Sequence, residues 1–197
     1  MITNESLIQL IQEDKWMLDI LKSAQSLNLP DWWICAGFVR AKVWDVLHGF
    51  SERTPLPDID VIYFDSTVQS AELEKEYEQT LLHLQPHLPW SVKNQARMHI
   101  VNRIPPYESS IDAISKFPET ATALGVKLND HGKVVLAAPH GIEDVVNCQV
   151  KPTPYFTQSE EQMEIYKDRV IKKNWKARWN KLEVFGMVSK EEYVREF

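Results

Sequence analysis

The chain has 197 residues, of which 44% are hydrophobic and 25% are charged, and its formal net charge at pH 7 is −6. This composition is typical of a folded globular protein and excludes a disordered, collagenous or coiled-coil chain. The negative charge disfavours a protein that coats nucleic acid over its whole surface. Only Cys35 and Cys148 are present, and the longest charge-free apolar run, 32–39, is far shorter than the roughly 20 residues that a bilayer span needs. We therefore expect a cytoplasmic protein without a membrane segment.

The first part of the chain predicts helices that lead into a pair of strands. Apolar residues recur at near-helical spacing over 5–27, which predicts one long helix or two short ones. The short apolar run 31–37 predicts a strand buried on both faces, and it passes through Gly37 into a helix over 38–50. After a loop with two prolines, β-branched and aromatic residues over 58–64 predict a second strand.

The second part of the chain predicts a mixture of helices and strands around the same sheet. An acidic helix is expected over 69–84, and alternating polar and apolar residues over 90–101 predict a third strand. The later elements are a helix at 109–117, a strand over 120–128, a turn at 129–132, a strand over 134–137, a helix from 139 to about 146 and a C-terminal helix over 159–182. We expect a single domain over 1–197, made of an N-terminal helical segment (1–28), a sheet core (30–150), and a linker with the C-terminal helix (151–197).

Two carboxylates and a glycine turn carry the chemistry of this pattern. Asp58 and Asp60 begin the second strand, where side chains two residues apart point to the same side with Cα atoms about 6.6 Å apart, so both can converge on a divalent cation. The turn at Gly37 leaves backbone N–H groups free at a helix N-terminus, which suits a phosphate, and Arg40 follows on that first turn. Each feature alone has an ordinary structural explanation, because Asp residues at loop ends commonly bind backbone donors. Their order and spacing favour a site for a metal and a nucleotide.

These motifs carry a resemblance to a known superfamily. Ala36-Gly37-Phe38 followed by Asp58-Ile59-Asp60 resembles the signature, a Gly followed by Asp-x-Asp, of polymerase β-like nucleotidyltransferases. Segments 36–45, 58–65, 92–99 and 117–126 resemble an uncharacterised bacterial nucleotidyltransferase-like family, and the likeness covers most of 30–185. The resemblance implies an α+β fold, a mixed β-sheet flanked by helices with added N- and C-terminal helices. It also implies that Asp58 and Asp60 bind Mg²⁺ or Mn²⁺, and that Gly37, Phe38 and Arg40 contact the nucleotide.

The function implied by the resemblance is transfer of an NMP from an NTP to a hydroxyl acceptor, which can be a small molecule, a protein or RNA. Two departures from the superfamily pattern bear on this function. The bulky Phe38 stands where a small residue is usual, and we expect it to narrow the phosphate site. The expected third carboxylate is missing from the 90–101 strand, where Asn94 takes its place, so that Asp112 or Glu119 would have to complete the site. The alternative is a nucleotide- or partner-binding module with the same fold and an incomplete, inactive metal site.

Two polar segments are open to a functional and a structural interpretation. The polar face of the 90–101 strand either lines the nucleotide cleft or is the solvent side of an edge strand; its members are Lys93, Gln95, Arg97 and His99. The segment 165–181 contains seven basic residues and one acid. It is either a surface that faces phosphate or RNA, with Trp175 and Trp179 for stacking, or an amphipathic helix packed on the core. We favour the packed helix, with an apolar stripe of Ile171, Trp175, Trp179 and Leu182.

Overall fold

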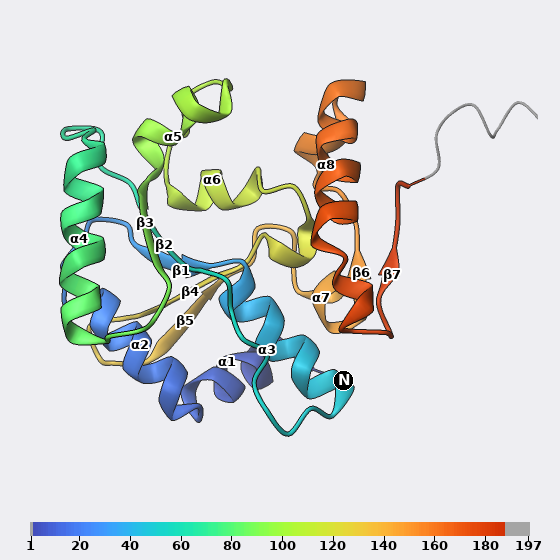
Figure 1. Ribbon diagram of the computed structural model, residues 1–197, viewed down its shortest axis with the longest axis horizontal. Coiled ribbons are helices and arrows are strands. Elements are labelled where there is room, and N and C mark those ends of the chain that lie inside the picture. The colour runs from blue at the N-terminus through green and yellow to red at the C-terminus, as the bar shows by residue number, and fades with distance from the viewer. Residues whose placement is uncertain (1, 188–197) are drawn as a thin grey trace, which may run out of the picture.

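A five-stranded mixed sheet forms the centre of the computed structural model, which describes residues 2–187 (Figure 1). Its strands are β1 (Trp33–Cys35), β2 (Ile59–Tyr63), β3 (Trp90–Asn94), β4 (Gly125–Leu128) and β5 (Val134–Ala137). They lie in the order β3-β2-β1-β4-β5, in which β2 and β3 are parallel and the other neighbours are antiparallel. The predicted hairpin between β4 and β5 and the predicted mixed sheet are both confirmed.

Two N-terminal helices cover one face of the sheet together with α3. The Thr3 hydroxyl caps α1 (Asn4–Gln12), and the Asp14 carboxylate accepts a hydrogen bond from the Met17 N–H to start α2 (Lys15–Gln25). Of the two arrangements predicted over 5–27, the structure therefore has two short helices, separated at Asp14. α3 (Gly37–His48) ends at Gly49, which adopts φ 69°, a left-handed conformation that favours glycine. Figure 1 shows the three helices below the sheet.

The sheet is also flanked at its edge and on its second face. α4 (Ala71–Leu84), capped by the Ser70 hydroxyl, packs against the edge strand β3. α6 (Ser110–Ser115) lies on the face opposite to α1 and α2 (Figure 1), where Ile114 packs in a small buried cluster with Trp33, Cys35 and Ile62. A Cβ atom at Gly125 would lie 2.9 Å from Ile114 Cδ1 and 3.2 Å from Cys35 Sγ, so a larger residue there would force this cluster to shift. The fold is thus the expected mixed sheet flanked by helices.

Three predicted elements are wrong in extent or type. The strand expected over 90–101 ends at Asn94, and α5 (Gln95–Asn102) follows, because the Asn94 carboxamide oxygen accepts a hydrogen bond from the Ala96 N–H at 3.0 Å and caps the helix. The strand expected over 120–128 begins only at Gly125, after the short 3₁₀ turn η1 (Thr120–Thr122). The helix expected from Pro139 is the single turn α7 (Glu143–Val146).

The C-terminal helix is also shorter than predicted. α8 (Glu160–Lys173) ends at Asn174, whose φ of 43° lies in the left-handed region, and the short 3₁₀ turns η2 (Pro154–Thr157) and η3 (Trp175–Ala177) flank it. β6 (Gln149–Val150) and β7 (Glu183–Val184) form a small parallel pair beside it. Trp175, Trp179 and Leu182 are buried as expected, whereas Ile171 is 65% exposed. Residues 188–197 of the predicted C-terminal segment lie outside the described part.

None of the helices between residues 2 and 187 has the length and apolar character that crossing a bilayer requires.

Candidate active site

The glycine turn and the two acids meet at one end of the sheet. Because β1 and β2 are antiparallel, with Ile34 paired to Val61, the end of β1 lies beside the start of β2. The chain leaves β1 at the Gly37 turn and enters β2 at Asp58, so both motifs lie at this same edge. A cavity of about 800 Å³ opens there, and Gly37, Asp58 and Asp60 all line it.

Burial and the nearby Asp58 carboxylate disfavour the negative charge of Asp60. Burial, and secondly the neighbouring Asp58 carboxylate, raise the pKa of Asp60 from 3.8 to about 6, against the opposing effect of a hydrogen bond from Ser91. A divalent cation would relieve this repulsion, and carboxylate oxygens are the donors that Mg²⁺ and Mn²⁺ prefer. Two carboxylates leave the remaining coordination positions to phosphate oxygens and water, so the donor set fits such an ion.

The predicted third position is wrong because the strand register places Asn94 elsewhere. In the parallel pairing of β2 with β3, Asp60 lies opposite Ser91, whereas Asn94 lies opposite Tyr63. Three residues along a strand correspond to roughly 10 Å. Ser91 is therefore the β3 residue next to Asp60.

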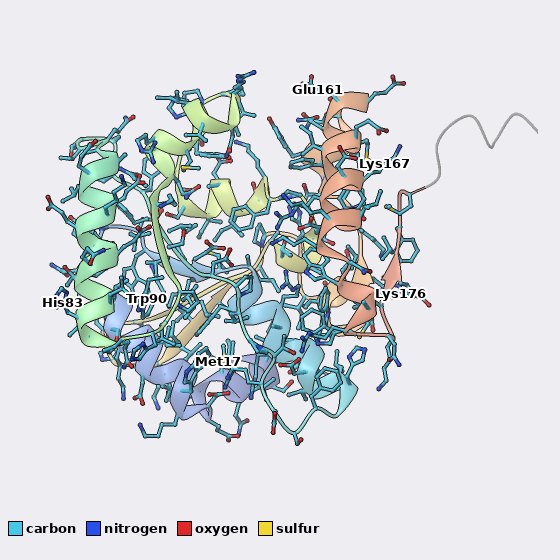
Figure 2. All side chains as sticks on the ribbon, viewed as in Figure 1. Met17, His83, Trp90, Glu161, Lys167 and Lys176 are labelled. Carbon is cyan, nitrogen blue, oxygen red and sulfur yellow. The ribbon has the colours of Figure 1, made fainter. Side chains whose placement is uncertain are left out.

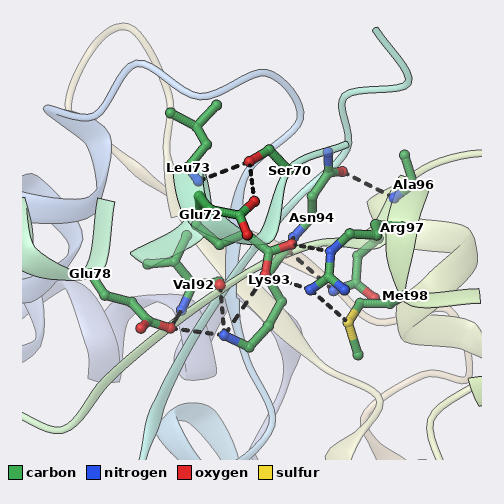
Figure 3. Close-up of polar contacts among 12 residues, drawn as sticks. Ser70, Glu72, Leu73, Glu78, Val92, Lys93, Asn94, Ala96, Arg97 and Met98 are labelled. Carbon is green, nitrogen blue, oxygen red and sulfur yellow. Dashed lines mark hydrogen bonds and ion pairs between the residues drawn. The ribbon is translucent and has the colours of Figure 1, made fainter. Parts of the chain in front are cut away.

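Asn94 is instead a structural residue. It is fully buried, and its amide nitrogen donates to the main-chain oxygens of Asp65 at 2.8 Å and Val68 at 2.9 Å. Together with the cap on the Ala96 N–H, which is drawn in Figure 3, these contacts hold the loop after β2 against the start of α5.

Neither of the other two candidate acids completes the metal site. Asp112 forms an ion pair with Lys116, and Glu119 is fully buried and forms an ion pair with Arg169. Between residues 2 and 187, no three His, Cys, Asp or Glu side chains come together in a way that could hold a metal ion.

The predicted polar face of a strand is instead a network that attaches α4 to the sheet. Glu74, which is 1% exposed, accepts bonds from the Arg97 guanidinium, at 2.7 Å to Nη2, and from the Asn94 N–H at 3.0 Å (Figure 3). Lys93 pairs with Glu78 at 2.8 Å. The cavity lining contains none of the expected nucleotide contacts Lys93, Arg97 and His99. The structure therefore does not bring them to the site.

The turn before α3 presents open backbone donors to the cavity. Ala36 adopts φ 54° and ψ −114°, a conformation that residues other than glycine rarely adopt, and its own N–H donates to the Leu124 carbonyl at 3.0 Å. No side chain caps α3, so the first N–H groups of the helix remain available. The Phe38 ring points away, is 2% exposed and stacks on Trp16 at 6.0 Å. The expectation that Phe38 narrows the phosphate site is wrong, and Phe38 can offer only its backbone.

Arg40 lines the cavity but is far more buried than expected. It is 7% exposed, and its guanidinium lies 4.5 Å from the ring centre of Trp175, 5.2 Å from Trp44 and 5.8 Å from Trp179. It makes no hydrogen bond or ion pair with any residue in the described part of the chain. Burial lowers its pKa to about 10, against the opposing attraction of the Glu119, Asp58 and Asp60 carboxylates. A buried charge normally has a partner of opposite sign. This arginine, beside the Gly37 turn, is therefore suited to an anionic ligand.

Three further cationic residues of the cavity were not among the predicted site residues. Arg169, Lys173 and Arg178 come from the basic segment 165–181, which runs along the right of Figure 2 past the labelled Lys167 and Lys176. The Arg169 Nε atom donates to the buried Glu119 carboxylate at 2.7 Å, which fixes its position. The basic composition is the available signal, and the four-residue spacing of Arg169 and Lys173 places them on one face of α8. Helical spacing does not locate Arg178, because the helix ends at Asn174. The tryptophans of this segment pack inward and some of its cations line the cavity.

Asp45 joins the three segments that surround the cavity. This buried carboxylate accepts hydrogen bonds from the Thr54 N–H at 2.8 Å, the Thr54 hydroxyl at 2.7 Å and the Trp179 Nε1–H at 2.9 Å. It thereby links α3, the loop that leads to Asp58, and the C-terminal segment. No sequence pattern marks it, since its partners are distant in the chain.

Comparisons with known proteins agree with this geometry. A solved NMR structure described as a CCA-adding enzyme head domain is 38% identical, with a TM-score of 0.80 over 91% of this chain and 94% of that one. A CCA-adding enzyme complexed with CTP (12% identity, TM-score 0.58) and the Thermotoga maritima CCA-adding enzyme complexed with tRNA (14%, 0.55) share the fold. Each match covers 98% of this chain but only 45% and 44% of those proteins, so the chain spans less than half of their length.

No curated protein matches the chain. A family model described as "Nucleotidyltransferase" matches residues 22–184. The chain therefore belongs to this nucleotidyltransferase family and has the polymerase β-like nucleotidyltransferase fold.

Proposed function

We propose that the protein is a Mg²⁺- or Mn²⁺-dependent nucleotidyltransferase that moves an NMP from an NTP to the hydroxyl of an acceptor. The observation that carries the proposal is the buried Arg40, which forms no hydrogen bond or ion pair with a described residue and shares one cavity with Asp58 and Asp60. A metal-bound triphosphate needs carboxylates that bind the metal ion and a cation that binds the phosphates. Asp58 and Asp60 can supply the first and Arg40 the second. The free, buried state of Cys35 and Cys148 agrees with a reducing, cytoplasmic compartment.

The reaction is a displacement at the α-phosphorus of the NTP. The acceptor oxygen forms a bond to this phosphorus, the bond to the pyrophosphate oxygen breaks, pyrophosphate leaves with the electron pair, and the hydroxyl proton passes to water. A divalent cation held by Asp58 and Asp60 would neutralise phosphate charge and acidify the hydroxyl. Arg40 and the open N–H groups of α3 would hold phosphate oxygens, and Arg169, Lys173 and Arg178, which line the same cavity, would stabilise the negative charge that develops on pyrophosphate.

A nucleotide-binding module without catalysis is the second candidate. It is favoured by Ser91, which stands beside Asp60 where a third acid would complete the site, and by the lack of a three-acid cluster within residues 2–187. The two candidates agree on metal-dependent NTP binding and differ only in turnover.

Thermal unfolding tests the metal and nucleotide site. We expect each NTP that binds with Mg²⁺ to raise the melting temperature of the parent, because a ligand of the native state stabilises it by mass action. EDTA or the double substitution Asp58→Asn and Asp60→Asn should remove the shift. Asp130→Asn, at an exposed acid in the β4–β5 turn, is the matched control and should keep it. An equal shift in the double variant would contradict the assignment.

Pyrophosphate release from NTP, with cell extract as a pool of acceptors, separates the two candidates. Release that the double variant loses and Asp130→Asn keeps supports the transferase. Mg²⁺-dependent binding without release in any extract supports the binding module.

A further inference from the structure

A second cavity, of about 670 Å³, adjoins the first. The two share Arg169 and Lys173, which line both. The second cavity lies between α8 and the segment from α5 to the end of α6, which face each other across the upper part of Figure 1. A molecule bound there would lie next to the site of the NTP phosphates.

Aromatic rings and cations line this second cavity, together with the carboxylate of Asp168. The rings are those of Tyr107, Phe117, Tyr155 and Phe156. Tyr107 is 6% exposed and its hydroxyl accepts a hydrogen bond from Asn102 at 3.0 Å, so its ring is held in place. Lys172 and Lys173 are exposed and form no ion pair with any residue in 2–187. Aromatic rings beside lysines bind a planar ring and a phosphate together.

The volume of the second cavity and the net charge of the protein favour a small ligand. Cavities of 300–1,000 Å³ typically hold small molecules. The segment 165–181 has a local charge of +6, and since the whole chain carries −6, the rest carries −12. This net negative charge repels a long polynucleotide, which carries many phosphates, more strongly than a nucleotide-sized ligand.

We propose that the second cavity binds the acceptor, a nucleotide-sized group with a planar ring, a phosphate and a free hydroxyl. This inference rests on the proposed transferase function. The hydroxyl oxygen of this group forms the bond to the α-phosphorus of the NTP in the first cavity, pyrophosphate leaves with the electron pair of the broken bond, and the proton passes to water. The same chemistry is present in a free nucleoside monophosphate and in the 3′ end of a short oligonucleotide.

Calorimetric titration with each of the four ribonucleoside monophosphates tests the proposal, on protein saturated with Mg²⁺ and a non-hydrolysable NTP. Lys172→Glu and Ile165→Glu change exposed residues of the second cavity, and we expect each to weaken monophosphate binding at least about tenfold. Lys176→Glu and Ile171→Glu are matched controls on the same segment, outside both cavities, and should stay within about threefold of the parent. NTP affinity should stay within about threefold in all four variants.

Several outcomes would overturn the acceptor site. One is that neither the monophosphates nor a short oligoribonucleotide with a free 3′ hydroxyl binds to the NTP-saturated protein. Another is an equal loss in the control variants, which would indicate general surface charge. Binding of the monophosphate supports a free nucleotide acceptor, and binding of the oligoribonucleotide alone, lost in the cavity variants only, supports a strand end. If the NTP itself fails to bind, the proposed function fails, and the same titration without NTP still tests the second cavity.

Discussion

Arg40 combines two opposing effects at the level of a single residue. Its guanidinium gains from three surrounding indole rings, an interaction worth about 0.5–2 kcal/mol when desolvated. It loses hydration without gaining an acceptor from any described residue, as the lowering of its pKa to about 10 indicates. A charge kept under this penalty stabilises the empty protein little, so we attribute its role to an anion.

Arg40→Met should separate binding from stability. Methionine retains the apolar stem and removes a buried charge, so we expect the free energy of unfolding without ligand to fall by no more than about 1 kcal/mol, or to rise. NTP binding should weaken by about 1.5–3 kcal/mol, which is a roughly ten- to 150-fold loss of affinity. Urea unfolding and calorimetry measure the two quantities. An unchanged NTP affinity would show that the phosphates bind elsewhere.

Asp60→Asn should stabilise the metal-free protein at neutral pH. The raised pKa means that folded Asp60 keeps its proton up to about pH 6, while the unfolded form loses it near 3.8, so this group lowers stability as pH rises between these values. The shift corresponds to about 2–3 kcal/mol. The stability gap between variant and parent in EDTA should therefore grow from pH 4 to pH 6 and then level off.

Urea unfolding at several pH values, with Asp130→Asn as the control, measures this gap. Adding Mg²⁺ at pH 7 should narrow it, because the parent alone keeps both carboxylates for the ion. The same gap at pH 4 and pH 7 would show that Asp60 carries no charge penalty in the folded protein.

The sequence predicts residues at this site only where local rules suffice. Gly37, Asp58 and Asp60 follow from a strand, a turn and the two-residue repeat of a strand, and the structure brings them into one cavity. The burial of Arg40 could not be predicted, because Trp175 and Trp179 arrive from the far end of the chain. The ring direction of Phe38 likewise depends on Trp16 from α2.

At the level of elements, the register of β2 against β3 decides which residue can assist the two acids. Ser91→Asp would place a third carboxylate opposite Asp60. We expect it to tighten Mg²⁺ or Mn²⁺ binding in the presence of a non-hydrolysable NTP at least about tenfold. If the natural site lacks a base, pyrophosphate release should rise as well.

Asn94→Asp is the matched comparison on the same strand, and it should act on stability alone. The carboxylate cannot donate to the carbonyls of Asp65 and Val68, so two buried acceptors lose their partner at a cost of about 2–4 kcal/mol. Metal titration and urea unfolding of both variants test the register. Tighter metal binding in Asn94→Asp and not in Ser91→Asp would contradict it.

Element boundaries show why the third position was misplaced. The alternation of polar and apolar residues over 90–101 is compatible with one long strand. It continues through Asn94, so the pattern does not reveal that Asn94 caps a helix. The strand β3 is only five residues long, and its register against β2 depends on the tertiary fold, which the local sequence does not encode. For helices α3 and α4, by contrast, the predicted ends agree with the structure to within two residues.

At the level of the whole molecule, contacts between distant segments form the cavity. The Trp44 indole N–H donates to the Val145 carbonyl at 3.0 Å, and the same ring packs edge-on against Trp179 at 5.1 Å. Asp45, the next residue, binds Thr54 and Trp179. One turn of α3 thus holds both the loop of Asp58 and the cationic C-terminal segment, so the NTP site depends on contacts far apart in the chain.

Asp45→Asn should loosen this arrangement and weaken NTP binding beyond its effect on stability. One side-chain oxygen is replaced by an NH₂ group, which opposes an N–H or O–H donor of Thr54 or Trp179, at a cost of about 1–3 kcal/mol. Asp144→Asn is the control, because Asp144 accepts bonds from Thr120 and Lys151 away from the cavity. Calorimetry well below the melting temperature should show about tenfold weaker Mg²⁺–NTP binding for Asp45→Asn and an unchanged affinity for Asp144→Asn. Both substitutions should nevertheless lower the free energy of unfolding. Equal NTP affinities in the two variants would show that Asp45 stabilises the fold without positioning the site.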